Sequence, residues 1–381
     1  MSNPLKSLAD AGQSVWLDYL HRKIIEDGEL GRLIHEDGLK GMTSNPTIFG
    51  AAIGEGHDYD ERLRAAMDNG ASDPEAVYEQ LAVGDIQAAA DVLRPVYDRM
   101  NGADGFVSLE VSPYVALDAD ATVAEARRLW ALVARPNVMI KVPGTTAGPA
   151  AISRLVGEGV NINVTLLFGI DAYLAAAEAH MAGLEAFKIA GGDIARVHGV
   201  ASLFVSRIDA KIDAQIDQRL QAGAGKDADA LKGLRGKVAI ANAKMAYQNY
   251  LGLIEGPRWQ ALAAAGATPQ RLLWASTGTK DPVYSDVLYV ESLIGPDTVN
   301  TMPMKTLDAF RDHGRVEPAL TRDLEEAGDV LSEAERLGLD LDGVTDALVS
   351  EGVRLFAESY DKLLRAIAEK RSLMRTVRRA S

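Results

Sequence analysis

Residues 137–146 have the sequence NVMIKVPGTT, and this stretch decides the fold class. Val138, Ile140 and Val142 alternate with other side chains, which is the two-residue period of a β-strand. Lys141 lies between two of these apolar residues, near the end of the predicted strand. Because removing water from an ammonium group is costly, a lysine is rarely buried without a partner or a function. The stretch therefore predicts a buried strand with a polar second face.

Seven further stretches resemble strands, and longer segments rich in Ala, Leu, Glu and Arg separate most of them. The eight predicted strands are VWLDYL (15–20), GMTSN (41–45), GFVSLEVS (105–112), NVMIKVP (137–143), VNINVTLLF (160–168), GVASLFVS (199–206), RLLWAST (271–277) and TVNTMP (298–303). Strands that alternate with helices indicate βαβ units and a parallel sheet. Eight units predict an α/β fold, a (β/α)8 TIM barrel. An open doubly wound sheet is less favoured, because no GxGxxG turn follows the first strand.

We expect one barrel domain over residues 1–381, with extra helices at two places. The segment 207–270 is too long for a single connecting helix and predicts an insertion of two or three helices. Residues 320–381 predict a C-terminal helical extension. Phe356 and Tyr360 lie on one stripe of that extension. They could cover the barrel mouth or pack in the core, and core packing is the favoured interpretation.

The composition excludes several classes of function. The net charge of −14 argues against a broad nucleic-acid surface. No apolar run approaches the roughly 18 residues of a membrane span, and the first residues lack the pattern of a signal peptide. The absence of cysteine excludes disulfides and thiolate metal sites, and it fits a cytoplasmic protein. Six histidines show no metal-ligand spacing and are predicted at the surface or in loops: His21, His35, His57, His180, His198 and His313.

The polar faces of the predicted strands carry the candidate catalytic residues. These are Asp18, Glu110, Lys141, Asn163 and Thr165, each toward the C-terminal end of its strand. A barrel interior is usually filled by branched aliphatic side chains, and barrel active sites lie at the C-terminal ends of the strands. An antiparallel sheet with one solvated face would show the same alternation. The helical connectors disfavour that alternative.

A lysine in a closed pocket is suited to covalent chemistry with carbonyl compounds. Burial destabilises the ammonium form, and the free amine can add to a ketone or aldehyde to form a Schiff base. Asp18 and Glu110 are the carboxylates available as bases. From residue types alone, a buried ion pair between Lys141 and one of these carboxylates explains the pattern equally well.

Six blocks of sequence, taken in order, resemble transaldolase. They are MTSNPTIF (42–49), VSLEV (107–111), MIKVPGT (139–145), NINVTLLF (161–168), SLFVSRID (202–209) and WASTGTKDP (274–282). The resemblance covers the strands from residue 15 to about 303 and favours the longer bacterial branch of the family. It implies a transferase of the non-oxidative pentose phosphate pathway that needs no metal or organic cofactor. Such an enzyme moves a dihydroxyacetone unit between sugar phosphates, from sedoheptulose 7-phosphate or fructose 6-phosphate to glyceraldehyde 3-phosphate or erythrose 4-phosphate.

The resemblance also implies a role for each motif residue. Lys141 would form the Schiff base, and Asp18 would take the C4 hydroxyl proton. Glu110 and Thr165 would act through a bound water. Asn45 and Asn163 would hold hydroxyls of the three-carbon fragment, and Ser202, Arg207, Ser276 and Lys280 would bind the phosphate. Thr43 and Phe204 are also expected to bind substrate. Shorter members carry arginine where this chain has Gly278, so Lys280 is inferred as its replacement.

Two other functions remain as alternatives. A related lyase releases free dihydroxyacetone, but such relatives carry glutamine at the position of Glu110 and tyrosine at that of Phe204, so this sequence favours the transferase. A sugar-phosphate sensor would not need to keep Asp18, Glu110 and Lys141 together. We expect small sugar phosphates as partners, no nucleic acid or membrane, and a monomer or homodimer.

Two further features have structural rather than catalytic interpretations. Asp209, Asp213 and Asp217 recur at every fourth position and are predicted to form a solvated helix face rather than a metal site. For Trp16 and Trp274, packing in the core and lining of the pocket are equally favoured.

Overall fold

The structure is a computed structural model that describes residues 3–54 and 56–380, with side chains described as far as residue 375. Eight parallel strands form a closed barrel in which each strand pairs with the next along the chain, and the eighth pairs with the first. The strands are β1 (Gln13–Asp18), β2 (Gly41–Thr43), β3 (Phe106–Glu110), β4 (Val138–Pro143), β5 (Ile162–Leu167), β6 (Gly199–Phe204), β7 (Arg271–Ala275) and β8 (Thr298–Met302). The predicted barrel is confirmed. Seven of the eight predicted stretches contain one of these strands, and the first stretch, 15–20, overlaps β1, which begins two residues earlier.

The strand register brings the polar residues to one end of the barrel. Asp18 pairs with Thr43 across β1 and β2, and Glu110 pairs with Lys141 across β3 and β4. Lys141 in turn pairs with Asn163 on β5. Because neighbouring residues of a parallel sheet that share a face lie side by side, these groups form one layer near the C-terminal ends of the strands.

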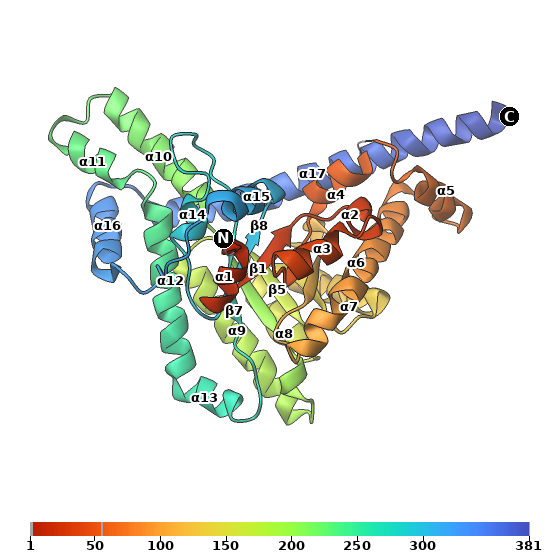
Figure 1. Cartoon of the computed structure of the whole chain (residues 1–381), viewed down its shortest axis with the longest axis horizontal. Coiled ribbons are helices and arrows are strands. Elements are labelled where there is room, and N and C mark those ends of the chain that lie inside the picture. Colours follow the sequence, from red (N-terminus) through yellow and green to blue (C-terminus); the bar gives the residue numbers. More distant parts are fainter. Residues whose placement is uncertain (1–2, 55, 381) are drawn as a thin grey trace.

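Helices surround the barrel and connect its strands (Figure 1). Those before β6 are α1 (Pro4–Asp10), α2 (Arg22–Glu26), α3 (Glu29–Glu36), α4 (Pro46–Gly54), α5 (Asp60–Asp68), α6 (Pro74–Arg99), α7 (Ala119–Val133), α8 (Gly148–Val156) and α9 (Ile170–Ile189). Those after β6 are α10 (Ser206–Gln221), α11 (Ala228–Leu234), α12 (Val238–Glu255), α13 (Pro257–Ala263), α14 (Leu288–Glu291), α15 (Met304–His313), α16 (Leu324–Arg336) and α17 (Leu341–Ala380). Short 3₁₀ turns lie at Pro113–Val115, Ile194–Arg196 and Gly225–Asp227. Among the described helices, none is long and apolar enough to cross a membrane.

The long segment between β6 and β7 forms four α-helices, α10 to α13, where the sequence predicted two or three. The extra break comes from Gly236, whose backbone has a φ of +68° and separates α11 from α12. α16, from the C-terminal part of the chain, packs against α12, and Figure 1 shows this group on one side of the barrel.

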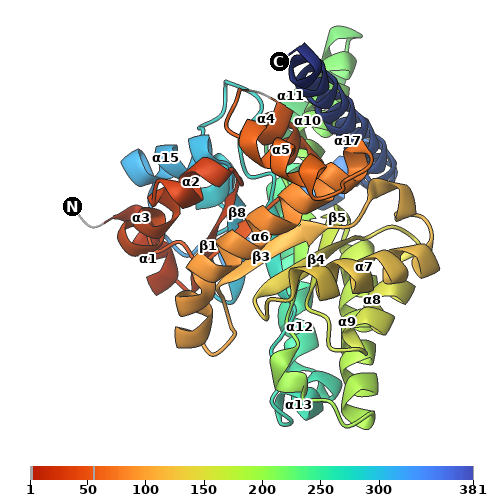
Figure 2. The ribbon, with the colours of Figure 1, turned by 90° about the vertical axis from the view of Figure 1, so that its right-hand side faces the viewer.

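The C-terminal extension consists of α16 and α17, and residue 381 lies outside the described residues. α17 packs on α4, α6 and α10 and also contacts β5. Figures 1 and 2 show it crossing the upper end of the barrel. Phe356 and Tyr360 are both buried on this helix, and Phe356 also lines the pocket described below.

Two predictions about exposure were wrong. His180 lies on α9 with 1% of its surface exposed, and burial lowers its pKa to about 4. Asp209 and Asp213 do not form a solvated face. They are 1% and 6% exposed, on a helix that packs against α11 and α12. Only Asp217 of that series is well exposed, with 48% of its side chain accessible.

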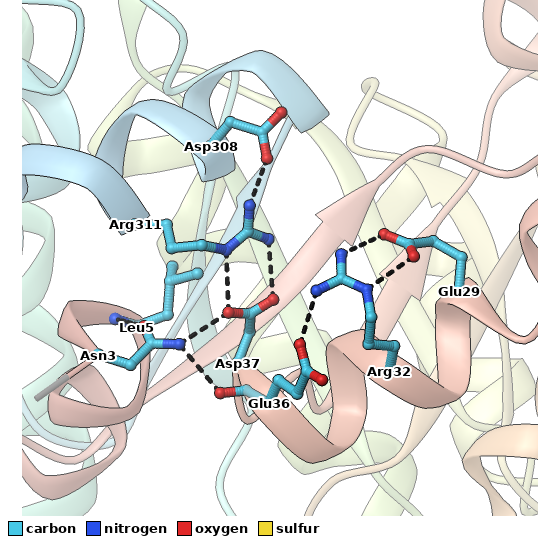
Figure 3. A network of polar contacts seen from close by, with 8 residues as sticks. All are labelled: Asn3, Leu5, Glu29, Arg32, Glu36, Asp37, Asp308 and Arg311. Carbon is cyan, nitrogen blue, oxygen red and sulfur yellow. Dashed lines mark hydrogen bonds and ion pairs between the residues drawn. The ribbon is translucent and has the colours of Figure 1, made fainter.

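A polar network at the chain's start fastens α1 to α3 and α15 (Figure 3). Asp37 accepts two hydrogen bonds from Arg311, at 2.9 and 2.8 Å, and a third from the side chain of Asn3 at 2.7 Å. Arg311 also pairs with Asp308 one turn earlier on α15. Because Asp37 is almost fully buried, these donors compensate for the water that its carboxylate loses.

Candidate active site

A pocket of about 660 Å³, including its open mouth, lies at the C-terminal ends of the strands. It is lined by Asp18, Thr43, Asn45, Lys141, Thr165, Ser202, Phe204, Arg207, Ala275, Ser276, Gly278, Lys280, Thr301, Pro303 and Phe356. Ten of the twelve residues predicted for the site belong to this lining. The other two, Glu110 and Asn163, lie behind it.

Lys141 is buried on the pocket wall, with 5% of its surface exposed. Its Nζ donates a hydrogen bond to the backbone oxygen of Ser44 at 3.2 Å and lies 3.5 Å from Oε2 of Glu110. The ion pair considered from sequence is therefore present, but it is longer than a hydrogen bond. The amine has one short contact, to a neutral carbonyl, and it also borders the open pocket.

Asp18 lies at the end of β1 and accepts a hydrogen bond from Oγ1 of Thr43 at 2.7 Å. Thr43 in turn lies 2.8 Å from the hydroxyl of Thr301 on β8. Burial raises the pKa of Asp18, while Lys141 and the Thr43 hydrogen bond oppose that rise. The carboxylate is thus held in one orientation and is more basic than an ordinary aspartate.

Glu110 and Thr165 are buried in the barrel, and their side-chain oxygens have no hydrogen-bond partner. Both carboxylate oxygens of Glu110 and Oγ1 of Thr165 are buried and have no hydrogen-bond partner, although Oε2 of Glu110 forms the long ion pair with Lys141. Burial raises the pKa of Glu110, and the charge of Lys141 opposes this. Buried polar atoms are normally satisfied, so unpaired ones in this layer mark a place where a water or substrate can bind.

Asn163 holds a neighbouring side chain in place rather than lining the pocket. It is fully buried, its amide nitrogen donates to Ser108 at 3.0 Å, and its oxygen accepts from the hydroxyl of Ser202 at 2.7 Å. Both ends of the Asn163 amide are therefore occupied. Ser202, which does line the pocket, is oriented by this contact.

Two cations also line the pocket. Arg207 lies in the first turn of α10, and its guanidinium is 5.3 Å from the ring centre of Phe204. Lys280 lies in the loop after β7. Burial lowers the pKa of both groups, and the charge of Arg207 lowers that of Lys280 further. Two cations near a helix N-terminus form a surface suited to a phosphate group.

Ser276, at the start of the same loop, is hydrogen-bonded to the first residue of α10. Its backbone oxygen accepts a hydrogen bond from Oγ of Ser206 at 2.6 Å, and its φ of +56° is in the left-handed region. A non-glycine residue in that region is uncommon and often belongs to a functional turn. The turn directs the following loop toward the pocket.

Sequence reasoning missed several parts of the lining. Thr301 lies on β8 on the side that it shares with Val299, so the polar alternation of Thr298 and Asn300 pointed to the other side of the strand. Ser44 lies outside the lining but accepts the hydrogen bond of Lys141 with its backbone oxygen, a contact that no sequence pattern reveals. Trp16 and Trp274 are fully buried and do not line the pocket, so the packing interpretation is the one the structure supports.

Comparisons with known proteins agree with this arrangement. The family model described as "Transaldolase/Fructose-6-phosphate aldolase" matches residues 15–367. A protein of Streptomyces coelicolor named "Transaldolase 1" is 49% identical over 366 residues, which are 96% of this chain and 94% of that protein. Proteins named "Transaldolase" from Thermobifida fusca and Trichodesmium erythraeum are 48% and 44% identical, each over 97% of this chain and 98% of the relative.

Proposed function

This chain belongs to the transaldolase and fructose-6-phosphate aldolase family, and we propose that it acts as a transaldolase. It would move a dihydroxyacetone unit from a ketose phosphate to an aldose phosphate. The observation that carries the proposal is the placement of Lys141. Its amine borders a pocket that is also lined by the Asp18 carboxylate and by two cations, Arg207 and Lys280.

The proposed reaction begins when the amine of Lys141 attacks C2 of the ketose. Loss of water from the carbinolamine gives an iminium ion, and a water bound between Glu110 and Thr165 would carry the protons for this step. The three unpaired oxygens of these two residues support that position. The substrate phosphate would bind to Arg207 and Lys280, helped by Ser276 and Ser202.

Cleavage follows from the same geometry. Asp18 takes the proton of the C4 hydroxyl while the C3–C4 bond breaks, and the electron pair of that bond moves into the iminium. The aldose phosphate leaves, and an enamine remains on Lys141. An acceptor aldose phosphate then binds, the enamine attacks its aldehyde, and the steps run in reverse. Thr43 keeps the Asp18 carboxylate aimed at the hydroxyl.

The lyase alternative differs in the fate of the enamine. Its hydrolysis would release free dihydroxyacetone instead of passing the unit on. Glu110 and Phe204 stand where the related lyases carry glutamine and tyrosine, and Phe204 packs against Phe168 with ring centres 5.3 Å apart. A tyrosine hydroxyl there would lie beside Arg207. The apolar ring gives no such polar group, which favours transfer to an acceptor.

The test is to mix the protein with fructose 6-phosphate, with and without erythrose 4-phosphate, and to follow the products by NMR. We expect sedoheptulose 7-phosphate only when the acceptor is present. Borohydride should trap the donor on the wild-type chain, and Lys141→Ala should lose both the trapping and the turnover. Full turnover by Lys141→Ala would refute the Schiff-base proposal, and steady release of dihydroxyacetone without acceptor would make the protein a lyase.

We also propose that the protein works in the cytoplasm on free sugar phosphates. The absence of cysteine fits a reducing compartment, and sugar phosphates are made and consumed there. Cell fractionation followed by immunodetection tests this placement. Recovery in the membrane or periplasmic fraction would contradict it.

A further inference from the structure

The three aspartates on one face of α10 hold the loop that carries Lys280, although the mechanism above gives them no task. Asp209 accepts a hydrogen bond from the hydroxyl of Tyr289 at 2.9 Å, and Asp213 accepts one from the hydroxyl of Tyr284 at 2.8 Å. Tyr284 and Tyr289 both follow Lys280 in the chain. Two turns of α10 therefore hold the segment that follows Lys280, Asp213 through the loop itself and Asp209 through α14, at the end of that loop.

The third contact lies closest to Lys280. Arg235 forms an ion pair with Asp217 of α10 and donates a hydrogen bond to Asp281 at 3.1 Å. Asp281 is the residue directly after Lys280. Because one guanidinium joins both carboxylates, it links α10 to the backbone that carries the Lys280 side chain.

The insertion supplies the remaining partners of the buried aspartates. The backbone N–H of Ala239 donates to Asp209 at 2.8 Å, and that of Gly236 donates to Asp213 at 3.2 Å. Each of these two carboxylates therefore accepts one hydrogen bond from a backbone N–H in or just before the first turn of α12. Each accepts a second one from a tyrosine hydroxyl that follows Lys280 in the chain. The Tyr284 ring also packs on Gly236, where a Cβ would lie 2.9 Å from it.

A clamp of this kind has a physical purpose, because Arg207 and Lys280 repel each other. The charge of Arg207 lowers the pKa of Lys280, which shows that the two groups interact. Repulsion favours a loop that swings away from Arg207. A phosphate is bound best when its two cations are already held at the right spacing, since ordering a loop at the moment of binding reduces affinity.

We propose that six residues form a clamp that sets the position of Lys280 relative to Arg207 and thereby the affinity for the substrate phosphate. They are Asp209, Asp213, Asp217, Arg235, Tyr284 and Tyr289. This inference rests on the proposed role of Arg207 and Lys280 as the phosphate site. The clamp residues touch neither the substrate nor Lys141. They are positioning residues that act through Lys280.

The variant Tyr284→Phe removes a single hydroxyl and keeps the ring on Gly236. We expect it to raise the inhibition constant of inorganic phosphate in the transfer reaction by roughly threefold to tenfold, while kcat changes less than twofold. Arg235→Ala should act in the same direction, since it frees Asp281 beside Lys280. The matched control is Tyr59→Phe, which removes a hydroxyl bonded to the buried Asp85 at 2.6 Å, away from the pocket lining. It should leave the inhibition constant unchanged.

A double-mutant cycle separates positioning of Lys280 from general loosening of the fold. In the Lys280→Ala background, Tyr284→Phe should have no further effect on the inhibition constant. The clamp is refuted if Tyr284→Phe alone changes nothing, or if its effect is fully retained without Lys280. If Arg207→Ala and Lys280→Ala both leave the inhibition constant unchanged, the phosphate site itself is misassigned and the clamp falls with it.

Discussion

Replacing Thr43 by valine should lower kcat/KM most on the acid side of the pH–rate profile. Thr43 donates a hydrogen bond of 2.7 Å to Asp18, and this bond opposes the rise in pKa that burial causes. Asp18 must be ionised to accept the C4 proton. Valine has nearly the same shape as threonine but offers no donor, so the pKa of Asp18 rises and the base is lost at a higher pH.

The expected size follows from the contact that is lost. A hydrogen bond to a charged group is worth about 1.5–3 kcal/mol, which is roughly a tenfold to hundredfold change in the ionisation equilibrium. At a pH below the acidic limbs of both proteins, kcat/KM of the variant should therefore be lower than that of the wild type by about that factor, once each is expressed relative to its own plateau. On the plateau, where Asp18 is ionised in both proteins, the loss should be much smaller.

The assay is kcat/KM for the transfer reaction from about pH 4.5 to 9, for the wild type and Thr43→Val. Thr301→Val is the matched control, because it removes a bond to the same threonine hydroxyl but none to the carboxylate. The control should keep the wild-type limb. An unmoved limb in Thr43→Val, or an equal drop at every pH, would mean that Asp18 is not the base whose ionisation Thr43 supports.

Two predictions concern stability rather than catalysis. Arg311→Ala should cost about 2–3 kcal/mol in urea unfolding at pH 7, because it leaves the buried Asp37 with only Asn3 as a side-chain donor, and the partial exposure of Arg311 keeps the cost below that of a fully buried pair. Burial raises the pKa of Asp37, but the hydrogen bonds from Arg311 and Asn3 outweigh it and lower that pKa. The stability that these bonds add is therefore lost as the pH falls, and the difference in unfolding free energy between variant and wild type should shrink below about pH 4. A difference that persists in acid would contradict this. Gly41→Ala should destabilise the barrel by about 1–3 kcal/mol or more, since a Cβ at Gly41 would lie 2.4 Å from the ring of the fully buried Trp16, and an unchanged unfolding midpoint would refute the close packing.

The barrel could be predicted from sequence because each strand carries its own signal. Short runs with a two-residue period recur between helical segments, and parallel pairing then follows from the connectors. For the same reason, the polar faces of β1, β4 and β5 placed Asp18, Lys141 and Thr165 in the lining of one pocket. The alternation of side chains shows which residues share one side of a strand. Closure of the barrel then directs the polar side inward.

What could not be predicted is how neighbouring elements cover a side chain. Asp209 and Asp213 have the spacing of a solvated helix face, and the same spacing serves a face that packs on backbone N–H groups. Nothing local distinguishes the two cases. Asn163 likewise lies on the inward side of β5, but the side chains of Ser108 and Ser202 occupy both ends of its amide and separate it from the pocket.

The burial of Lys141 within a strand has a physical explanation in the charges around it. Burial acts against every charge in the pocket: it raises the pKa of Asp18 and Glu110 and lowers that of Arg207 and Lys280. Lys141 lies close enough to two carboxylates for its charge to lower the pKa of both, so the buried ammonium has charges of opposite sign beside it. Glu110 pairs with the amine only at 3.5 Å, and the one short contact of the amine is to the backbone oxygen of Ser44, so Lys141 still borders the open pocket.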